Sequence, residues 1–202
     1  MENDYQYIDP DYKYTNKSGV LYNLANIDDE KVLLAYESLN VSKRLEELYE
    51  KPIKTKDTNS LLAIHKHLFQ DIYAWAGKPR TVNISKNGKH FFDGQRFPTA
   101  FRYVDTLISE YRKIRKTDKQ ALAQKLAEIL DNVNYLHPFR EGNGRAQREF
   151  LRSLSLEKGL IINLNPPDNT DIYERYMQGT IDSDVAKLAT LILELITKNK
   201  VA

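Results

Sequence analysis

The chain of 202 residues contains no cysteine, which excludes disulfide cross-links and metal sites built from thiolates and suits a reducing compartment. It also lacks any run approaching the roughly 18 consecutive apolar residues of a transmembrane helix, and its polar first residues lack the apolar stretch of a signal peptide. Charge of one sign is not in excess, because 30 basic and 28 acidic residues leave a formal net charge of +2. A near-neutral chain does not favour nucleic-acid binding, so we expect no direct contact with DNA or RNA. Together with the absences above, this composition predicts a cytoplasmic protein with no membrane segment.

The spacing of the apolar residues predicts an all-α protein with one β-hairpin. Apolar side chains that recur every three or four residues, between capping residues, glycines or prolines, predict helices at about 28–49, 57–77, 98–111, 117–136, 144–158, 170–178 and 182–198. Asn87-Gly88 is a strong turn signal between two short stretches, 81–84 and 89–92, and predicts a hairpin after the second helix. We expect residues 28–198 to form one domain, with residues 1–27 as an N-terminal arm packed on it.

Features that phosphate chemistry requires occur together in the stretch HPFREGNGRAQR. Gly142-Asn143-Gly144 stands directly before a predicted helix, where unpaired backbone N–H groups and the helix dipole attract an anion. The glycines let the backbone approach a ligand without a Cβ in the way. Arg145 and Arg148 lie three residues apart in the first turn, so their guanidinium groups share a face beside this cradle and suit a polyphosphate.

The same stretch contains a candidate metal ligand and a candidate general base. Glu141 precedes the glycines, and one carboxylate together with phosphate oxygens is a usual way to hold Mg²⁺. His137 stands between a helix end and Pro138, and its unperturbed pKa near neutrality would let it accept a hydroxyl proton. Taken singly, a histidine at a helix end, a glycine turn and two helix-face arginines are ordinary structural features. Their occurrence together and in this order predicts a magnesium-dependent phosphate-transfer site.

This stretch resembles the signature of the Fic family, HPFx[D/E]GNGRxxR, at every specified position. Residues 73–80, YAWAGKPR, are similar to the family's YxWAGKxR segment, which leads into a hairpin known as the flap. Residues 9–27 are similar to the start of bacterial Fic toxins that pair with a small antitoxin. The resemblance covers nearly the whole chain and is strongest from 60 to 160.

The resemblance implies a Fic-type helical bundle that transfers AMP from ATP to a Tyr, Thr or Ser hydroxyl of a target protein, with release of pyrophosphate. By position, His137 would deprotonate the target hydroxyl, and Glu141 would hold Mg²⁺ between the α- and β-phosphates. The other signature positions would bind phosphate: Asn143 and the backbone of Gly142 and Gly144 the α- and β-oxygens, Arg145 the β-phosphate, and Arg148 the γ-phosphate.

Two further surfaces are predicted to contact substrates. Tyr173, Tyr176 and Met177 follow the signature at helical spacing and are candidates for the adenine pocket, although a buried core stripe is an equally good interpretation. A two-stranded flap leaves one edge unpaired, to which a target segment could add as a strand. The docking candidates there are Thr81, Val82, Asn83, Ile84, Lys89, His90 and Phe91, and the alternative is a hairpin that simply packs on the helices.

Inhibition in trans is expected because a family motif is missing. Many Fic proteins are restrained by a helix with the pattern [S/T]xxxE[G/N], whose glutamate pairs with the second signature arginine, here Arg148. Neither Ser42–Glu46 nor Thr190–Glu194 is followed by Gly or Asn, so we expect a small antitoxin to supply the glutamate. By analogy with bacterial Fic toxins, the ATPase subunits of type II topoisomerases are the first candidate targets.

Two alternatives remain open from the sequence. The chain could be a Fic-fold transferase of another nucleotide or phosphate moiety, although the intact glycines argue against the family's kinase branch. It could also be a non-catalytic nucleotide- or protein-binding module, which would need the cradle but would have no use for His137 and Glu141. The other histidines show no recognised metal-ligand spacing, and we expect His65 and His67 to be packing or surface residues.

Overall fold

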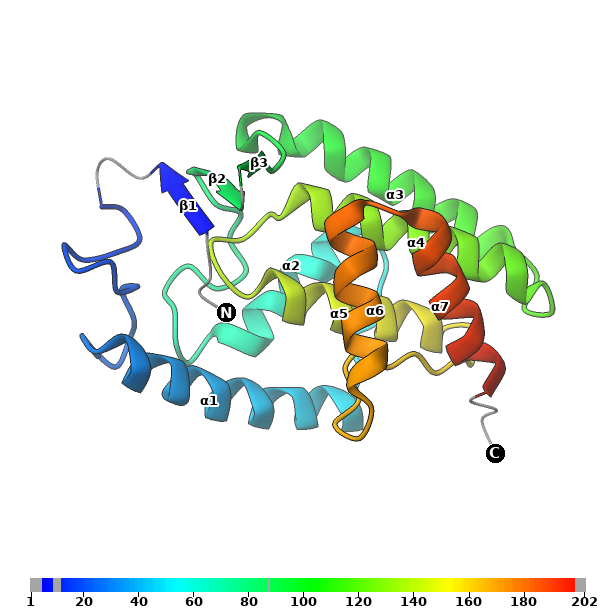
Figure 1. Cartoon of the computed structure of the whole chain (residues 1–202), viewed down its shortest axis with the longest axis horizontal. Coiled ribbons are helices and arrows are strands. Elements are labelled where there is room, and N and C mark those ends of the chain that lie inside the picture. The colour runs from blue at the N-terminus through cyan, green and yellow to red at the C-terminus, as the bar shows by residue number, and fades with distance from the viewer. Residues whose placement is uncertain (1–4, 9–11, 87, 199–202) are drawn as a thin grey trace.

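The computed structural model describes residues 5–8, 12–86 and 88–198, and it confirms the predicted fold class (Figure 1). The helices are α1 (Glu30–Glu50), α2 (Thr58–Phe69), α3 (Phe97–Lys113), α4 (Lys119–Leu136), α5 (Asn143–Leu156), α6 (Thr170–Asp182) and α7 (Val185–Lys198). A single 3-10 turn, Gly94–Arg96, precedes α3. Within the described part of the chain, no helix is both long and apolar enough to cross a bilayer.

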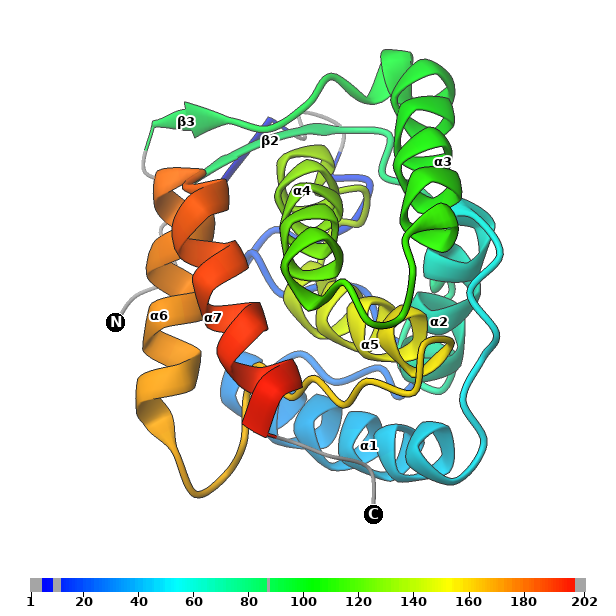
Figure 2. The same cartoon turned by 90° about the vertical axis from the view of Figure 1, so that its right-hand side faces the viewer.

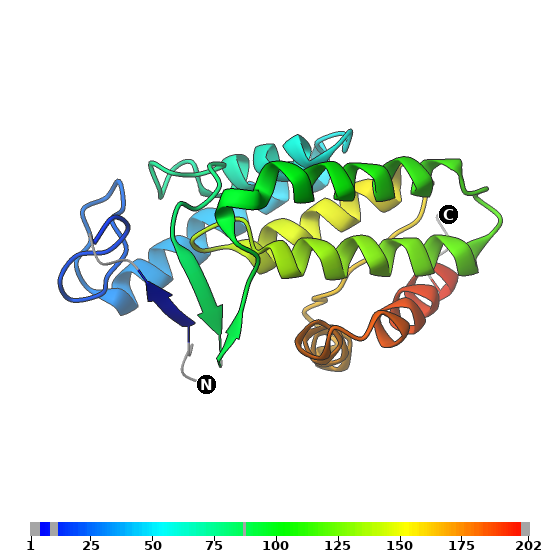
Figure 3. The same ribbon diagram turned by 90° about the horizontal axis from the view of Figure 1, so that it is seen from above.

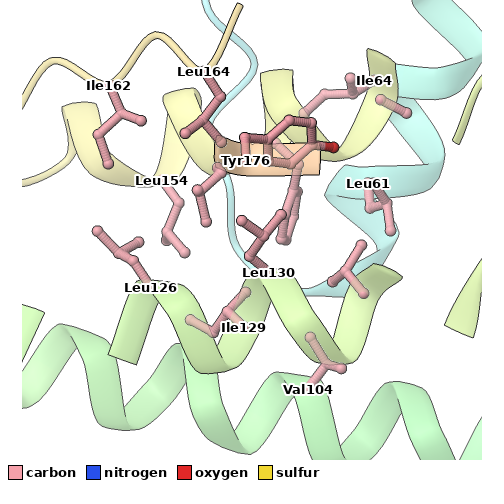
Figure 4. Close-up of a cluster of buried hydrophobic side chains, with 14 of the residues drawn as sticks. Leu61, Ile64, Val104, Leu126, Ile129, Leu130, Leu154, Ile162, Leu164 and Tyr176 are labelled. Atoms are coloured by element: carbon pink, nitrogen blue, oxygen red, sulfur yellow. The ribbon is translucent and has the colours of Figure 1, made fainter. Parts of the chain in front are cut away.

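Helix α4 lies in the middle of the bundle, where it packs against α3, α5 and α7 (Figure 2). Helix α2 contacts α5 and also joins α1 and α3 to the bundle. The side chains between these helices are almost fully buried, and the burial of each large apolar side chain contributes about 1.5 to 3 kcal/mol. Figure 4 shows part of this core, in which Leu126, Ile129 and Leu130 of α4 face Leu154 of α5 and the segment that carries Ile162 and Leu164.

The second helix is shorter than the sequence predicts. Helix α2 ends at Phe69, and the chain then forms successive turns up to residue 77. Ile72 and Tyr73 are buried at 0% and 2% exposure in these turns, so their apolar character imitates a continuing helix. Gly77 therefore does not cap α2. It has a positive φ of 75° and lies so close to α2 that a Cβ would stand 2.6 Å from the Cβ of Lys66.

The predicted hairpin is present, but it belongs to a three-stranded antiparallel sheet. Strands β2 (Asn83–Lys86) and β3 (Lys89–His90) pair as expected, while Asn87 of the predicted turn lies outside the described residues. Strand β1 (Tyr5–Ile8), from the N-terminal arm, pairs with the other edge of β2. Figure 3 shows the three strands at the end of the bundle where α3 begins. The hairpin itself is present. The expectation that the flap has only two strands was wrong, because β1, which is distant in sequence, pairs with β2.

Candidate active site

His137 ends helix α4 in a left-handed conformation, with φ 44° and ψ 58°. This backbone conformation costs a residue with a Cβ on the order of 1 to 2 kcal/mol, so contacts with surrounding residues must stabilise the conformation. Its Nδ1 lies 3.2 Å from the carbonyl oxygen of Asn134. A carbonyl can only accept, so Nδ1 carries the proton and Nε2 is the basic nitrogen. His137 is 6% exposed, and the ring of Phe91 from the flap stacks on it at 3.9 Å between centroids.

The predicted phosphate cradle is formed by the start of α5. Gly142 precedes the helix with φ +80°, and a Cβ there would stand 2.2 Å from Cζ of Phe69. Glycine is therefore required both by the backbone conformation and by the close approach of a buried ring. No side chain caps this end of α5, so the first backbone N–H groups of the helix are left for an anion.

Asn143 contributes to the cradle differently from the sequence expectation. Its side-chain amide donates to the carbonyl of Phe139 at 2.8 Å, and its side-chain oxygen accepts from the N–H of Phe139 at 2.8 Å. Both functional groups therefore close the loop on itself, and the side chain is 5% exposed. What Asn143 can offer a phosphate is its backbone N–H, so the role expected for the residue moves from its side chain to its backbone.

Arg145 is held by a buried carboxylate that the sequence analysis missed. Glu37 of α1 accepts from Arg145 Nη2 at 2.6 Å, and Glu141 accepts from the same nitrogen at 3.3 Å. The guanidinium also lies over the ring of Phe69, 4.8 Å from its centroid. Glu37 is only 4% exposed and accepts a second hydrogen bond from the hydroxyl of Tyr73. Burial, together with the charge of Glu37, raises the pKa of Tyr73, which keeps the hydroxyl as a donor.

A sequence signal for Glu37 did exist. Leu33, Glu37 and Val41 are spaced by four residues, which places them on one helix face, and all three are buried. A glutamate inside such an apolar stripe is rarely buried without a partner charge. This signal indicates a buried ion pair but not its partner, because Arg145 lies far along the chain.

His65 of α2 also supports the loop, and it is fully buried. The backbone N–H of Gly77 donates to its Nδ1 at 2.9 Å, so Nε2 carries the proton and donates to the carbonyl of Glu141 at 2.9 Å. Its ring stacks on Phe139 at 3.7 Å between centroids. Burial lowers the pKa of His65 to about 3, so the ring is neutral at physiological pH. The expected packing role is confirmed, and its hydrogen bonds extend that role to the signature loop.

Glu141 has an oxygen suited to a metal ion. Its Oε1 accepts from the N–H of Gly142 at 2.8 Å and from Arg145 Nη2, whereas its Oε2 makes no hydrogen bond or ion pair to the described residues. Among these residues no group of three or more His, Asp or Glu side chains could hold a metal by itself. A single carboxylate oxygen beside an anion cradle fits a Mg²⁺ ion that shares its coordination with phosphate oxygens and water.

Arg148 projects along α5 beside the cradle, since a Cβ on Gly144 would stand 3.2 Å from its Nη1. Arg145 and Arg148 line the same cavity of about 130 Å³, between α5, the end of α1 and residues 162–165. No ion pair between Arg148 and a carboxylate occurs in the described part of the chain. Both guanidinium groups thus border one small cavity along α5, which Glu149 and Arg152 also line.

The predicted adenine residues lie beside Arg148. Its guanidinium carbon is 5.6 Å from the ring centroid of Tyr173 and 5.7 Å from that of Tyr176. Tyr176, however, is 1% exposed, and its hydroxyl accepts from Gln147 at 2.5 Å, so its ring belongs to the core and is closed to a ligand. Tyr173 and Met177 are half-buried. For Tyr176 the core interpretation is therefore the correct one.

The two internal glutamates that imitate an inhibitory motif do not reach Arg148. Glu194 of α7 forms a bidentate ion pair with Arg175 of α6, at 2.8 and 2.9 Å. Glu46 is exposed on α1. Glu194 is thus engaged by Arg175, and Glu46 faces solvent.

The pairing of β1 with β2 changes which of the predicted docking residues lie at an open edge of the sheet. Asn83 and Ile84 lie in β2, between β1 and β3, and Ile84 is 2% exposed. Thr81 is bonded through its N–H and its Oγ1 to the hydroxyl of Tyr14 in the arm. Among the described strands, β1 and β3 are the outer ones, and each has one edge without a partner strand. Both edges of β2 are occupied, so a strand added on the hairpin side would meet Lys89–His90 of β3 and the following Phe91.

Comparison with known proteins identifies the family of the chain. The sequence profile of the Fic/DOC family matches residues 55–155. The chain is 36% identical over 152 residues to "Protein adenylyltransferase VbhT" of Bartonella schoenbuchensis, which covers 74% of this chain and 32% of VbhT. It is 34% identical over 182 residues to "Probable protein adenylyltransferase y4lH" of Sinorhizobium fredii, which covers 88% of this chain and 91% of y4lH. The chain thus spans about a third of the first relative and most of the second.

Solved structures share the fold. The N-terminal FIC domain of Bep8 from a Bartonella species superposes with a TM-score of 0.80 at 20% identity, covering 92% of this chain and 94% of that one. BepC from Bartonella tribocorum, solved with bound AMPPNP, superposes with a TM-score of 0.78 at 21% identity, covering 91% and 96%.

Proposed function

The chain belongs to the Fic/DOC family, and on that premise we propose that it is a protein adenylyltransferase, which transfers AMP from ATP to a hydroxyl side chain of a target protein. The observation that carries the proposal is the joint arrangement of a basic His137 Nε2, an uncapped helix N-terminus and two arginines on one cavity. Relatives similar over most of this chain are named protein adenylyltransferases.

The reaction is an in-line displacement at the α-phosphorus of ATP. Nε2 of His137 accepts the proton of a Tyr, Thr or Ser hydroxyl while that oxygen attacks the α-phosphorus. The new bond joins the target oxygen to the phosphorus of AMP, and the bond from the α-phosphorus to the oxygen bridging it to the β-phosphate breaks. Pyrophosphate leaves with the electron pair. The contribution of the protein is mainly positioning and charge stabilisation.

The triphosphate is held by the start of α5. Backbone N–H groups of Gly142, Asn143 and Gly144 bind α- and β-oxygens, Arg145 binds the β-phosphate, and Arg148 binds the γ-phosphate. Glu141 would hold Mg²⁺ through its carboxylate, and the ion would supply positive charge that offsets the charge of the phosphates. Tyr173 and Met177 remain candidates for contact with adenine, because both are half-buried and Tyr173 lies beside Arg148.

Two protein partners are proposed, a target protein at the flap and an antitoxin at Arg148. A segment of the target adds as a strand to the outer edge of β3, which presents its hydroxyl to His137 beneath the flap. Type II topoisomerase ATPase subunits are the first targets to test. A small antitoxin supplies a glutamate to Arg148, a proposal supported by the absence of a carboxylate partner for this arginine among the described residues. In this scheme the chain is a cytoplasmic toxin, with residues 28–198 as its catalytic domain and residues 1–27 as a packed arm.

Transfer of isotope from ATP tests the proposal and separates the alternatives. The protein is incubated with bacterial lysate and Mg²⁺, with the label on either the α- or the γ-phosphate of ATP. Adenylyl transfer labels protein only from the α-position, whereas a kinase labels only from the γ-position. Competition by unlabelled CTP, GTP and UTP reports the nucleotide preference. Nucleotide binding by calorimetry without any protein labelling would refute the enzyme and favour a binding module.

A further inference from the structure

Arg80 is a buried arginine that joins the signature loop to the flap. It is 2% exposed, and it lies in the chain between the turns after α2 and the start of β2. Among the described residues, its hydrogen-bond partners are all backbone carbonyl oxygens. A buried charge with this set of partners is unusual, because buried arginines normally pair with a carboxylate.

The carbonyls that Arg80 binds belong to two groups. On the loop side, its Nε donates to His137 O at 2.8 Å and its Nη2 donates to Leu136 O at 3.3 Å, while its backbone N–H donates to Pro138 O at 2.7 Å. On the flap side, Nη1 donates to Val82 O at 2.7 Å and Nη2 donates to Phe92 O at 2.5 Å. One planar guanidinium therefore spans the residues before and after the hairpin and the end of α4.

These contacts account for the conformation of the catalytic histidine. Leu136 and His137 contribute the last carbonyls of α4, which have no partner within the helix and carry the negative end of its dipole. A positive guanidinium stabilises that end and orients the carbonyl of a residue in the left-handed conformation. Helix propensity supplies neither effect.

The flap contacts also place an aromatic ring, that of Phe91, against His137. Phe92 is fixed at both backbone groups, since its N–H donates to Tyr135 O at 3.1 Å and its carbonyl accepts from Arg80. Phe91, the preceding residue, stacks on the imidazole of His137. The distance between the edge of β3 and the base therefore depends on Arg80.

We propose that Arg80 is a positioning residue that holds the target-docking flap and His137 in a fixed relative arrangement, so that a hydroxyl presented by the flap reaches Nε2. The proposal rests on the proposed function. It predicts a separation of effects, because the hydrogen bonds of Arg80 to the described residues involve neither the N-terminus of α5 nor Arg145 nor Arg148. Disturbing Arg80 should impair transfer and leave nucleotide binding intact.

Arg80→Lys is the test variant, because lysine keeps the charge but cannot reach carbonyls on both sides with one small ammonium group. Arg112→Lys is the matched control. Arg112 also donates to backbone carbonyls, those of Thr55 and Lys56, and pairs with Glu157, but it does so near the end of α3 remote from the flap. For each protein we would measure ATP affinity by calorimetry, protein labelling from α-labelled ATP at saturation, and hydrogen exchange at the Phe91 and Phe92 amides.

For Arg80→Lys we expect labelling to fall about 100-fold, as a misplacement near 1 Å can cause, with ATP affinity unchanged and faster exchange at both amides. Arg112→Lys should change none of the three. Equal labelling by Arg80→Lys and the parent, an equal loss in both variants, or parental exchange at the two amides would overturn the proposal.

Two further outcomes remain decisive. If the parent protein does not label any target, the proposed function fails, and the exchange measurement still judges the role of Arg80. If Arg80→Lys does not fold, the Nε–H of Arg80 is followed by NMR in the parent protein. Protection from exchange with solvent supports the bridge to His137, and exchange as fast as that of a surface arginine contradicts it.

Discussion

Replacing Gly142 by alanine tests the physical basis of the cradle most directly. Two costs can be separated for this substitution. A left-handed conformation costs a residue with a Cβ about 1 to 2 kcal/mol. The new Cβ would also lie 2.2 Å from Cζ of Phe69, and overpacking of a core costs about 1 to 3 kcal/mol. Together the expected destabilisation is about 2 to 5 kcal/mol.

The chain offers a control that carries only the first cost. Gly19 has φ +84°, close to the +80° of Gly142, but a Cβ there would meet nothing within 4 Å. Gly19→Ala should therefore cost about 1 to 2 kcal/mol. For a chain of this size 1 kcal/mol corresponds to roughly 2 to 4 °C in melting temperature, so thermal unfolding can resolve the difference between the variants.

The displaced ring links stability to ligand binding. Phe69 is fully buried and lies under the guanidinium of Arg145. A shift of this ring should therefore move both Arg145, the proposed contact of the β-phosphate, and the backbone N–H groups. We expect Gly142→Ala to weaken ATP binding about tenfold or more, equivalent to 1.4 kcal/mol, and Gly19→Ala to leave it unchanged. Equal melting temperatures and equal ATP affinities in the two variants would refute the steric argument.

Four other predictions concern single side chains. His137→Ala should reduce target labelling by about 10² to 10⁴ while calorimetry shows ATP binding largely intact, and labelling at the parent rate would exclude His137 as the base. Glu141→Ala should weaken ATP binding only when Mg²⁺ is present, so identical parent affinities with and without Mg²⁺ would argue against a metal role. His65 has a folded pKa of about 3, below its unfolded value of 6.5, so its contribution to stability is complete above pH 6.5 and is lost as pH falls toward 3. The melting temperature should therefore fall less between pH 7 and pH 5 in His65→Gln than in the parent. Glu194→Gly should lower stability slightly by removing the ion pair with Arg175 and leave labelling unchanged, whereas a many-fold rise would show internal inhibition.

Local features of the site were predictable because they are encoded over a few neighbouring residues. Pro138 ends α4 at His137, and glycines before α5 leave its first N–H groups uncapped. Arg145 and Arg148 share a face because a helix repeats every 3.6 residues. The hairpin followed from its turn signal, although β2 begins two residues later than expected and β3 is shorter than expected.

Features that depend on several segments were not predictable in this way. The apolar spacing of Ile72 and Tyr73 extended the predicted second helix, because periodicity reports burial and cannot distinguish a helix from buried turns. The pairing of β1 with β2 was missed since neither strand specifies its partner in its own residues. Tyr176 matched both a ligand pocket and a core stripe until its burial decided for the core.

The sequence by itself determined the helical class and the chemical groups of the signature loop, because capping, periodicity and turn formation act between residues close along the chain. Only the tertiary structure decided which groups hold that loop in place. Glu37 from α1, His65 from α2 and Arg80 from the segment before β2 each reach the loop through long-range contacts. Their charges and hydrogen bonds acquire a function once packing has brought separate helices together, and no local pattern specifies those partners.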